Sequence, residues 1–274
     1  MLRLRRCMYA LGGLALLSTV RPVAAQTTIG FDVAGFSDYV WRGLTFTNNL
    51  VIQPDVWVSF PLGGTALTIG GWANIEPSKY NGSGDISEGG GAAGPDVAEF
   101  DWWADLTKTF GTATFTVGAT GYIFPNDFGF TSQFNTIEAY VKLVLAVPMI
   151  SPKINAYYDL DVVKGLYVEG SVSHGFPVAP GFSLTLGALG GLSAGQSCDP
   201  NSSGVCQVLG NFFDNGLTHV DLNASGSFAV GPLSVAPQFH FVINHDEFTK
   251  TNGDDTKVWF GAVISWSKTT GGSE

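Results

Sequence analysis

The chain has 274 residues, with 13 basic and 23 acidic side chains and a formal net charge of −10. This acidic excess argues against nucleic acid or an anionic membrane surface as the partner. Glycine occurs 36 times and proline 13 times, without the period of three that marks a collagen-like fibre.

The first 25 residues have the pattern of a secretory signal peptide. Three arginines precede a short apolar run, and Ala24-Ala25 completes a small-residue cleavage site. We therefore expect residues 1–25 to be removed on export, leaving 26–274. Because Cys7 lies before the apolar run and not at its end, we do not expect a lipoprotein.

The remainder of the chain holds no uncharged apolar stretch long enough for a transmembrane helix. No linker-like change of composition divides it, so we expect a single domain over 26–274. The pattern of this domain indicates β-structure throughout.

The clearest β pattern runs over residues 99–123. Phe100 and Trp102 point to one face, whereas Asp101 points to the other, and this period of two continues on both sides of Gly111. Gly111 suits the connection because glycine adopts positive φ at little cost. The stretch therefore predicts an antiparallel hairpin with one apolar and one polar face.

The same alternation predicts twelve strands in all. Each has about ten residues, the length with which a tilted strand crosses a bilayer. The expected strands are 29–42, 51–60, 67–75, 99–107, 112–123, 137–147, 153–161, 166–173, 182–190, 220–230, 233–243 and 257–266.

The connections between these strands alternate in length. Every second one is short, at 61–64, 109–112, 147–152, 176–181 and 230–232. Most of the others are long, at 43–49, 76–96, 124–134, 193–216 and 245–256, with 162–165 as the exception. An even number of strands with short turns on one side and long loops on the other is typical of a bacterial outer-membrane barrel.

A soluble β-sandwich would also show alternating strands of this kind. Two features favour a transmembrane antiparallel up-and-down β-barrel. The strands exceed the usual five to six residues of soluble sheets. Aromatic residues also lie near strand ends on the apolar face, as in the aromatic girdles of membrane barrels: Tyr39, Trp41, Phe60, Phe124, Phe182 and Trp266.

The polar faces of the strands are mainly acidic, and in a barrel they would face the lumen. Rings of carboxylates bias a pore towards cations or neutral solutes. A polar interior crossed by ion pairs that conducts little is the alternative. The candidate pore-lining residues are Asp38, Arg42, Glu99, Asp101, Asp105, Glu138, Asp159, Glu169 and Asp221; Asp32, Asp55, Asp161, Lys142, Lys153 and Lys257 share these faces.

Asp38 and Arg42 are expected on the interior face of the first strand, close to its end. An Asp38–Arg42 pair would shape a constriction or serve as a structural ion pair that holds the first long loop.

Cys198 and Cys206 lie in one predicted loop of an exported chain, which favours a disulfide between them. We expect no metal site and no cofactor. Ser227 and His240 fall on adjacent strands and could meet in a hydrolase site, but no motif supports an enzyme.

The segment Ser37-Asp38-Tyr39-Val40-Trp41-Arg42-Gly43, followed by Leu44-Thr45-Phe46-Thr47, resembles the TorF-like putative porins. Members of that family begin with a strand that ends in a similar segment. Many continue with Ser-Gln after the Arg-Gly, where this chain has Thr45-Phe46. The resemblance implies an outer-membrane barrel for passive passage of solutes. The chain does not finish on an aromatic residue, which is common in such barrels: Trp266 is followed by SKTTGGSE.

These observations predict a porin-like channel in a Gram-negative outer membrane, in contact with lipid, that admits small hydrophilic solutes by diffusion. The alternative is a barrel that displays the loops 76–96 and 193–216 for structural or adhesive purposes without significant conduction.

Overall fold

The computed structural model describes residues 26–77, 96–125, 135–147, 149–196, 211–212, 214–245 and 255–270. The predicted signal peptide and both predicted disulfide cysteines, Cys198 and Cys206, lie outside these ranges. The described residues form fourteen strands, of which twelve close into one barrel. The prediction of an all-β, twelve-stranded antiparallel barrel is confirmed.

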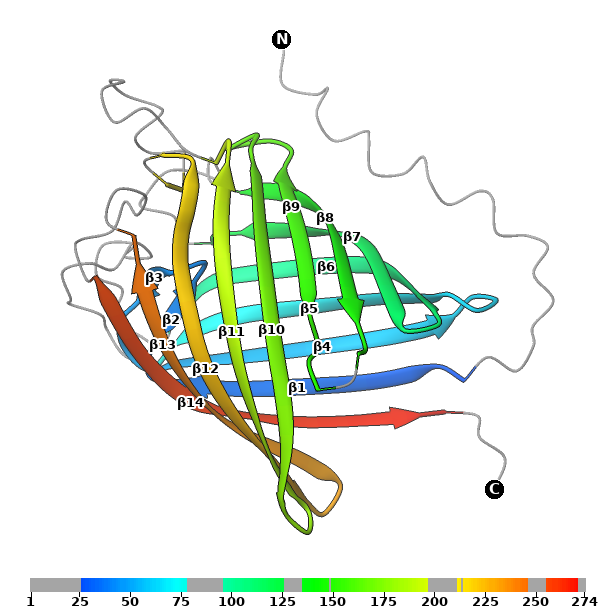
Figure 1. Cartoon of the computed structure of the whole chain (residues 1–274). Coiled ribbons are helices and arrows are strands. Elements are labelled where there is room, and N and C mark those ends of the chain that lie inside the picture. The colour runs from blue at the N-terminus through cyan, green and yellow to red at the C-terminus, as the bar shows by residue number, and fades with distance from the viewer. Residues whose placement is uncertain are drawn as a thin grey trace.

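The barrel strands follow one another around the wall in chain order, each antiparallel to the next, and β14 pairs with β1 to close it (Figure 1). Their bounds are β1 Thr28–Phe36, β4 Val51–Pro61, β5 Ala66–Glu76, β6 Asp96–Phe110, β7 Ala113–Ile123, β8 Thr136–Leu145, β9 Lys153–Asp159, β10 Leu166–Ala179, β11 Phe182–Ala194, β12 Gly216–Val230, β13 Leu233–Asn244 and β14 Thr256–Thr269.

The hairpin predicted over 99–123 is β6–β7, with the turn at Gly111, whose φ is 60°. Its register pairs Trp102 with Gly121 and Asp101 with Tyr122. The period of two in the sequence therefore corresponds to the two faces of the wall.

The distribution of side chains is the reverse of that in a soluble protein. Large apolar side chains are exposed on the outside, for example Val56 at 59% and Phe260 at 58%. Carboxylates are buried inside, for example Glu138 at 2% and Glu99 at 4%. Because a closed sheet satisfies its backbone hydrogen bonds internally, this arrangement suits a hydrocarbon environment. Among the described residues, no helix is long and apolar enough to span a membrane.

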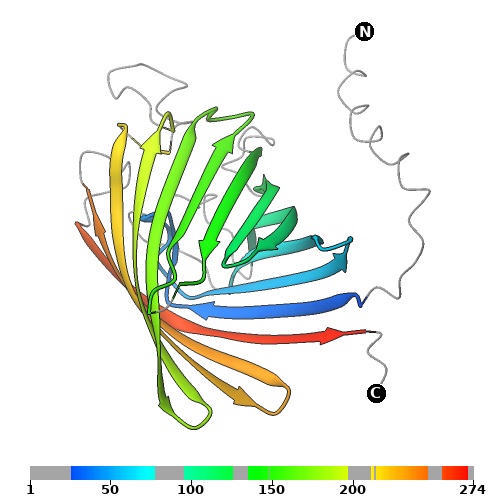
Figure 2. The ribbon, with the colours of Figure 1, turned by 45° about the vertical axis from the view of Figure 1, so that its right-hand side comes forward.

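Two short strands, β2 Tyr39–Trp41 and β3 Leu44–Thr47, form a separate hairpin between β1 and β4. The contacts described below hold this hairpin against the inner wall, and Figures 1 and 2 place it within the outline of the barrel. The expectation that the first strand continues to residue 42 is wrong, because β1 ends at Phe36 and the chain then turns inward.

The two ends of the barrel differ. We call the end with the turns 62–65, 111–112, 146–152, 180–181 and 231–232 the short-turn end, and the opposite end, where β1 leads into the β2–β3 hairpin, the long-loop end. At the short-turn end the rim is uneven, since β10 pairs with β9 only from Leu166 to Ser171 and then continues beyond it (Figures 1 and 2).

Candidate functional site

The tip of the β2–β3 hairpin is a two-residue turn made by Arg42 and Gly43. Their φ angles are 52° and 82°, so both residues lie in the left-handed region. Turns with two such residues match the twist of a hairpin, and glycine at the second position adopts this backbone at little cost. Arginine does so less readily, so the surrounding contacts must hold Arg42 in place.

Arg42 reaches from the turn to Glu138 on β8. The two guanidinium nitrogens Nη1 and Nη2 donate to the two carboxylate oxygens of Glu138 at 2.8 and 2.7 Å. The side chains are only 5% and 3% exposed. This is a bidentate, buried ion pair between segments 96 residues apart in the sequence.

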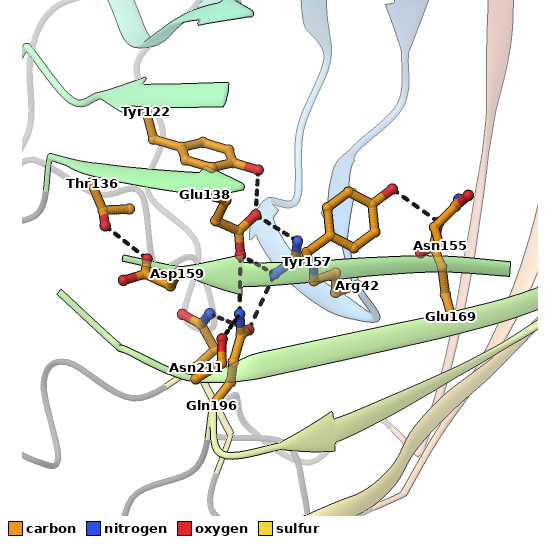
Figure 3. Close-up of polar contacts among 11 residues, drawn as sticks. Arg42, Tyr122, Thr136, Glu138, Asn155, Tyr157, Asp159, Glu169, Gln196 and Asn211 are labelled. Atoms are coloured by element: carbon orange, nitrogen blue, oxygen red, sulfur yellow. Dashed lines mark hydrogen bonds and ion pairs between the residues drawn. The ribbon is translucent and has the colours of Figure 1, made fainter. Parts of the chain in front are cut away.

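Further polar groups complete the bonding of this pair (Figure 3). Tyr122 donates its hydroxyl to Glu138 at 2.8 Å. Gln196, at the end of β11, donates to Glu138 at 3.0 Å and accepts from Arg42 at 3.1 Å. Asn211 donates to Gln196 at 2.9 Å. A buried ion pair stabilises a structure only when its remaining hydrogen-bonding groups are satisfied, and here most of them are.

Aromatic rings surround the guanidinium of Arg42. Its Cζ atom lies 4.1 Å from the ring centre of Trp41, 4.3 Å from that of Tyr167 and 4.7 Å from that of Tyr157. Burial disfavours the charged form, but Glu138 outweighs burial, so the pKa of Arg42 is raised above its ordinary value. The side chain is a fixed positive charge.

Asp38 forms a second contact between the hairpin segment and the wall. Its carboxylate lies 2.5 Å from the Lys257 ammonium on β14. The predicted Asp38–Arg42 pair is therefore wrong: the inward turn separates the two side chains, and each pairs with a different strand. Both ion pairs nevertheless attach the same hairpin segment to the barrel wall.

A third contact lies between Tyr39 and the β5–β6 wall. Tyr39 packs against Trp72 with ring centres 5.6 Å apart and is hydrogen-bonded to Glu99. Burial, followed by the charges of Glu99 and Asp101, raises the pKa of Tyr39. The placement of Tyr39 and Trp41 in a membrane-facing aromatic girdle is wrong, because both belong to the inner hairpin.

Four other predicted lumen carboxylates, Asp105, Asp159, Glu169 and Asp221, have local partners of their own. Asp159 accepts from the backbone N–H groups of Asp161, Val163 and Lys164 at 2.8–3.1 Å. These three hydrogen bonds to Asp159 stabilise a tight 160–165 turn, which is consistent with the short connection between β9 and β10.

Three further acidic residues are partnered across strands. Glu169 accepts from Asn155 at 2.7 Å and Tyr157 at 3.3 Å, and Asp105 accepts from Tyr140 at 3.2 Å. Asp221 lies 2.8 Å from Nδ1 of His240. These pairs hold the lumen carboxylates in defined positions.

The inner wall formed by β1, β4, β5 and β6 has an open hollow of about 390 Å³ towards the short-turn end. It is lined by Asp32, Asp55, Trp57, Ser59, Thr68 and Trp103. The sequence predicted Asp32 and Asp55 on interior faces but did not group them with the other four residues into a site. A usable signal in the sequence was that two large aromatic residues, Trp57 and Trp103, lie on the otherwise polar faces of their strands.

The hydrolase pairing of Ser227 with His240 is not formed. His240 is in register with Asn223, four residues along β12 from Ser227, a separation of roughly 13 Å at the rise of a strand. Its two ring nitrogens contact Asp221 and Gln238, and the ring stacks on Trp259 with centres 3.7 Å apart. Within the described ranges, no three His, Cys, Asp or Glu side chains are grouped as metal ligands.

The fold is similar to that of one solved outer membrane channel. A solved outer membrane channel from Pseudomonas putida F1 superimposes with a TM-score of 0.57 at 14% identity, covering 91% of this chain and 100% of that one. The KdgM porin and the NanC porin give TM-scores of 0.44 and 0.45 at 8% and 10% identity, covering 87% and 88% of this chain and 98% and 99% of theirs. A search of curated protein sequences gave no significant match.

A family model described as a bacterial protein of unknown function, Gcw_chp, matches residues 22–236. The match extends from before the first strand into β13 and includes the hairpin and the Arg42–Glu138 pair, whereas Lys257, the partner of Asp38, lies beyond it. The chain belongs to the Gcw_chp family.

Proposed function

We propose that this protein is an outer-membrane channel for passive diffusion of small hydrophilic solutes. The observation that carries the proposal is a closed barrel with apolar side chains outside and carboxylates inside, in which, among the described residues, the β2–β3 hairpin lies towards the long-loop end of the lumen. An open hollow of about 390 Å³ on the polar inner wall supports the proposal, since it leaves room for a small solute.

The charge of the lumen supports a preference for cations or neutral solutes. The lysine and arginine of the hairpin contacts are paired: Arg42 with Glu138 and Lys257 with Asp38. In the described part of the chain, Asp32 and Asp55 have no basic side chain within ion-pair distance. Unpaired carboxylates in a low-dielectric wall attract cations.

The orientation and export follow from the same proposal. Short turns face the periplasm and long loops face the exterior in known outer-membrane barrels, so the hairpin would lie on the outer side. Residues 1–25 would act as the signal peptide, and 26–274 as the mature barrel. The resemblance of residues 37–47 to the TorF-like porins fits this proposal, since that segment is the inward hairpin.

A platform for displayed loops is the second candidate function. The loops 76–96 and 193–216 are long, and deletion of both should then abolish partner binding while the barrel stays folded. A hydrolase is disfavoured, because Ser227 and His240 do not meet.

Planar bilayer recordings test the channel proposal. We expect discrete current steps with a reversal potential, in a salt gradient, that shows cation preference. Replacement of residues 38–48 by a Gly-Ser linker should increase the step size, since it removes the hairpin from the lumen. A folded barrel that stays silent in both forms would refute the channel, and an unchanged step size would refute the role of the hairpin.

A further inference from the structure

The lumen wall below the hairpin carries a row of alternating glycine and tryptophan across four strands. Gly30 on β1 is in register with Trp57 on β4, Trp57 with Gly70 on β5, and Gly70 with Trp103 on β6. Because register partners lie side by side on one face, the four residues form a continuous strip.

The two glycines allow the indole rings to lie flat against the wall. A Cβ atom at Gly30 would lie 2.5 Å from the Trp57 ring, and one at Gly70 would lie 2.4 Å from the Trp103 ring. Any side chain at these positions would therefore push the rings away. One face of each indole is held against backbone, and both rings contribute to the lining of the hollow.

Carboxylates border this strip on one side. Asp32 and Asp55 are direct cross-strand partners on β1 and β4, two residues from Gly30 and Trp57 respectively. Like charges in this position repel each other, which disfavours the empty site. The Trp103 indole N–H contacts Asp55 at 3.4 Å, so the carboxylate is oriented at the edge of the aromatic surface.

Hydroxyl groups border the strip on the other side. Ser59 and Thr68 are register partners, and their hydroxyls are hydrogen-bonded at 3.1 Å. The hollow of about 390 Å³ is therefore lined by two carboxylates, two indoles and two hydroxyls, and its lining includes no lysine or arginine. It lies next to the hairpin, since Tyr39 packs on Trp72, the partner of Asp55.

We propose that this strip and the Asp32–Asp55 pair form a binding subsite for a small organic ammonium cation within the lumen. The flat indole faces attract a cation through their π electrons, and they favour a weakly hydrated organic cation over a strongly hydrated metal ion. The two carboxylates supply charge neutralisation, and the cation in turn relieves their repulsion. The hollow is open to the lumen, which suits the weak binding that a transport path requires.

The proposal rests on the channel function, because it names the class of solute that the lumen selects. Binding and conduction are nevertheless separate measurements. A barrel that binds the cation but does not conduct would refute the channel and leave the subsite standing. A barrel that conducts without binding it would refute the subsite alone.

Choline chloride is the probe, with sodium chloride and glucose as comparisons. We expect calorimetric titration of the folded barrel in detergent to detect choline binding in a background of sodium, with glucose binding at least tenfold weaker. In bilayers, choline should reduce the sodium current from the short-turn side. Glucose binding as strong as choline binding, or no choline binding, would overturn the proposal.

Variants separate the subsite from general electrostatics. Asp55→Asn and Trp103→Leu should each weaken choline binding about tenfold. Glu169→Gln is the matched control, since it removes one lumen carboxylate outside the hollow and should leave choline binding within about twofold. If all three variants weaken binding equally, the effect is the overall charge of the lumen and the subsite is refuted.

A further variant tests the position of the Trp103 ring without replacing any side chain that lines the hollow. Gly70→Ala leaves Asp55 and Trp103 in place but displaces the Trp103 ring. It should weaken choline binding severalfold while the circular dichroism spectrum stays close to that of the unmodified protein. If Gly70→Ala does not fold, Trp103→Phe provides the test: a smaller, less electron-rich ring should bind choline less well, and unchanged binding would contradict the aromatic contribution.

Discussion

The two halves of the lumen are built from similar residues but differ in how those residues are paired. Towards the long-loop end, Arg42 is bonded to Glu138 and Gln196 and enclosed by aromatic rings. Towards the short-turn end, Asp32 and Asp55 lie beside two indoles without a basic partner in the described part of the chain. The first half is built as a fixed structure and the second as a surface that can receive a solute.

The difference arises from a single inward turn. Because the chain leaves the wall after Phe36, it carries a positive charge and several aromatic rings into one half of the barrel only. In that half Arg42 pairs with Glu138 and Lys257 pairs with Asp38, whereas Asp32 and Asp55 in the other half have no basic side chain within ion-pair distance in the described part of the chain. The predictions below test this contrast, from the largest expected effect to the smallest.

Glu138→Ala should have the largest effect on stability. It leaves the buried Arg42 charge unpaired, which costs about 3–5 kcal/mol in comparable sites. We expect lower resistance to guanidinium unfolding, followed by tryptophan fluorescence in detergent, and a larger single-channel conductance because the hairpin is released. Glu169→Ala, which removes only bonds from neutral donors, is the control. Equal losses for the two variants would contradict the special role of the Arg42–Glu138 pair.

Gly43→Ala should destabilise the hairpin by about 2–3 kcal/mol, because it adds strain at positive φ and a collision. The new Cβ would lie 2.7 Å from the His219 ring. Gly63→Ala is the matched control: its φ is 59°, but no atom lies within 4 Å of the added Cβ. The control should cost about 1 kcal/mol. Guanidinium unfolding of both variants measures the difference, and a Gly43→Ala variant no less stable than the control would argue against tight packing at the tip.

Arg42→Lys should weaken the hairpin contacts by about 1–2 kcal/mol, since an ammonium cannot make the two parallel bonds to Glu138. In bilayers we expect more frequent current fluctuations at an unchanged main conductance level. Lys257→Arg, at the other ion pair of this segment, serves as the comparison and should fluctuate no more than the unmodified channel. If Arg42→Lys shows no more current fluctuations than the unmodified channel, a positive charge at this position is sufficient to hold the hairpin.

Lys142→Gln should have the smallest effect. The Lys142 ammonium lies 4.1 Å from the ring centre of Tyr140 on the lumen side, and its removal makes the lumen more negative. The cation-to-anion permeability ratio, obtained from the reversal potential, should rise about twofold, because salt partly screens the charge. Lys108→Gln, on the outer face beside Phe110, should leave the ratio unchanged. A lower cation-to-anion permeability ratio for Lys142→Gln would contradict an acidic lumen that favours cations.

Much of the fold could be predicted from the sequence, because the period of two decides which face of each strand meets water. The β6–β7 hairpin shows this most clearly: alternation from Phe100 onward and a glycine at the turn were sufficient. The same rule gave a wrong end for the first strand, which was predicted to reach residue 42. The alternation continues past Phe36 into a segment that no longer belongs to the wall. Periodicity identifies a strand but not the surface against which it packs.

The candidate site was predictable in part. The polar faces identified Glu138 and Arg42, but no pattern in one sequence pairs residues 96 positions apart. The Arg42-Gly43 dipeptide between two short apolar segments was a usable signal for a tight hairpin. Asp159 shows the opposite case: a carboxylate on the predicted lumen face that bonds to the backbone of its own turn.

The pairing of β1 with β14 has a consequence for assembly. Thr28 lies opposite Thr269, so the ring cannot close until the last strand has been delivered to the first. Before that moment the sheet has two free edges, and each is able to pair with a foreign strand. A chain shortened before β14 would keep those edges open, and its expected fate is aggregation or capture by assembly factors.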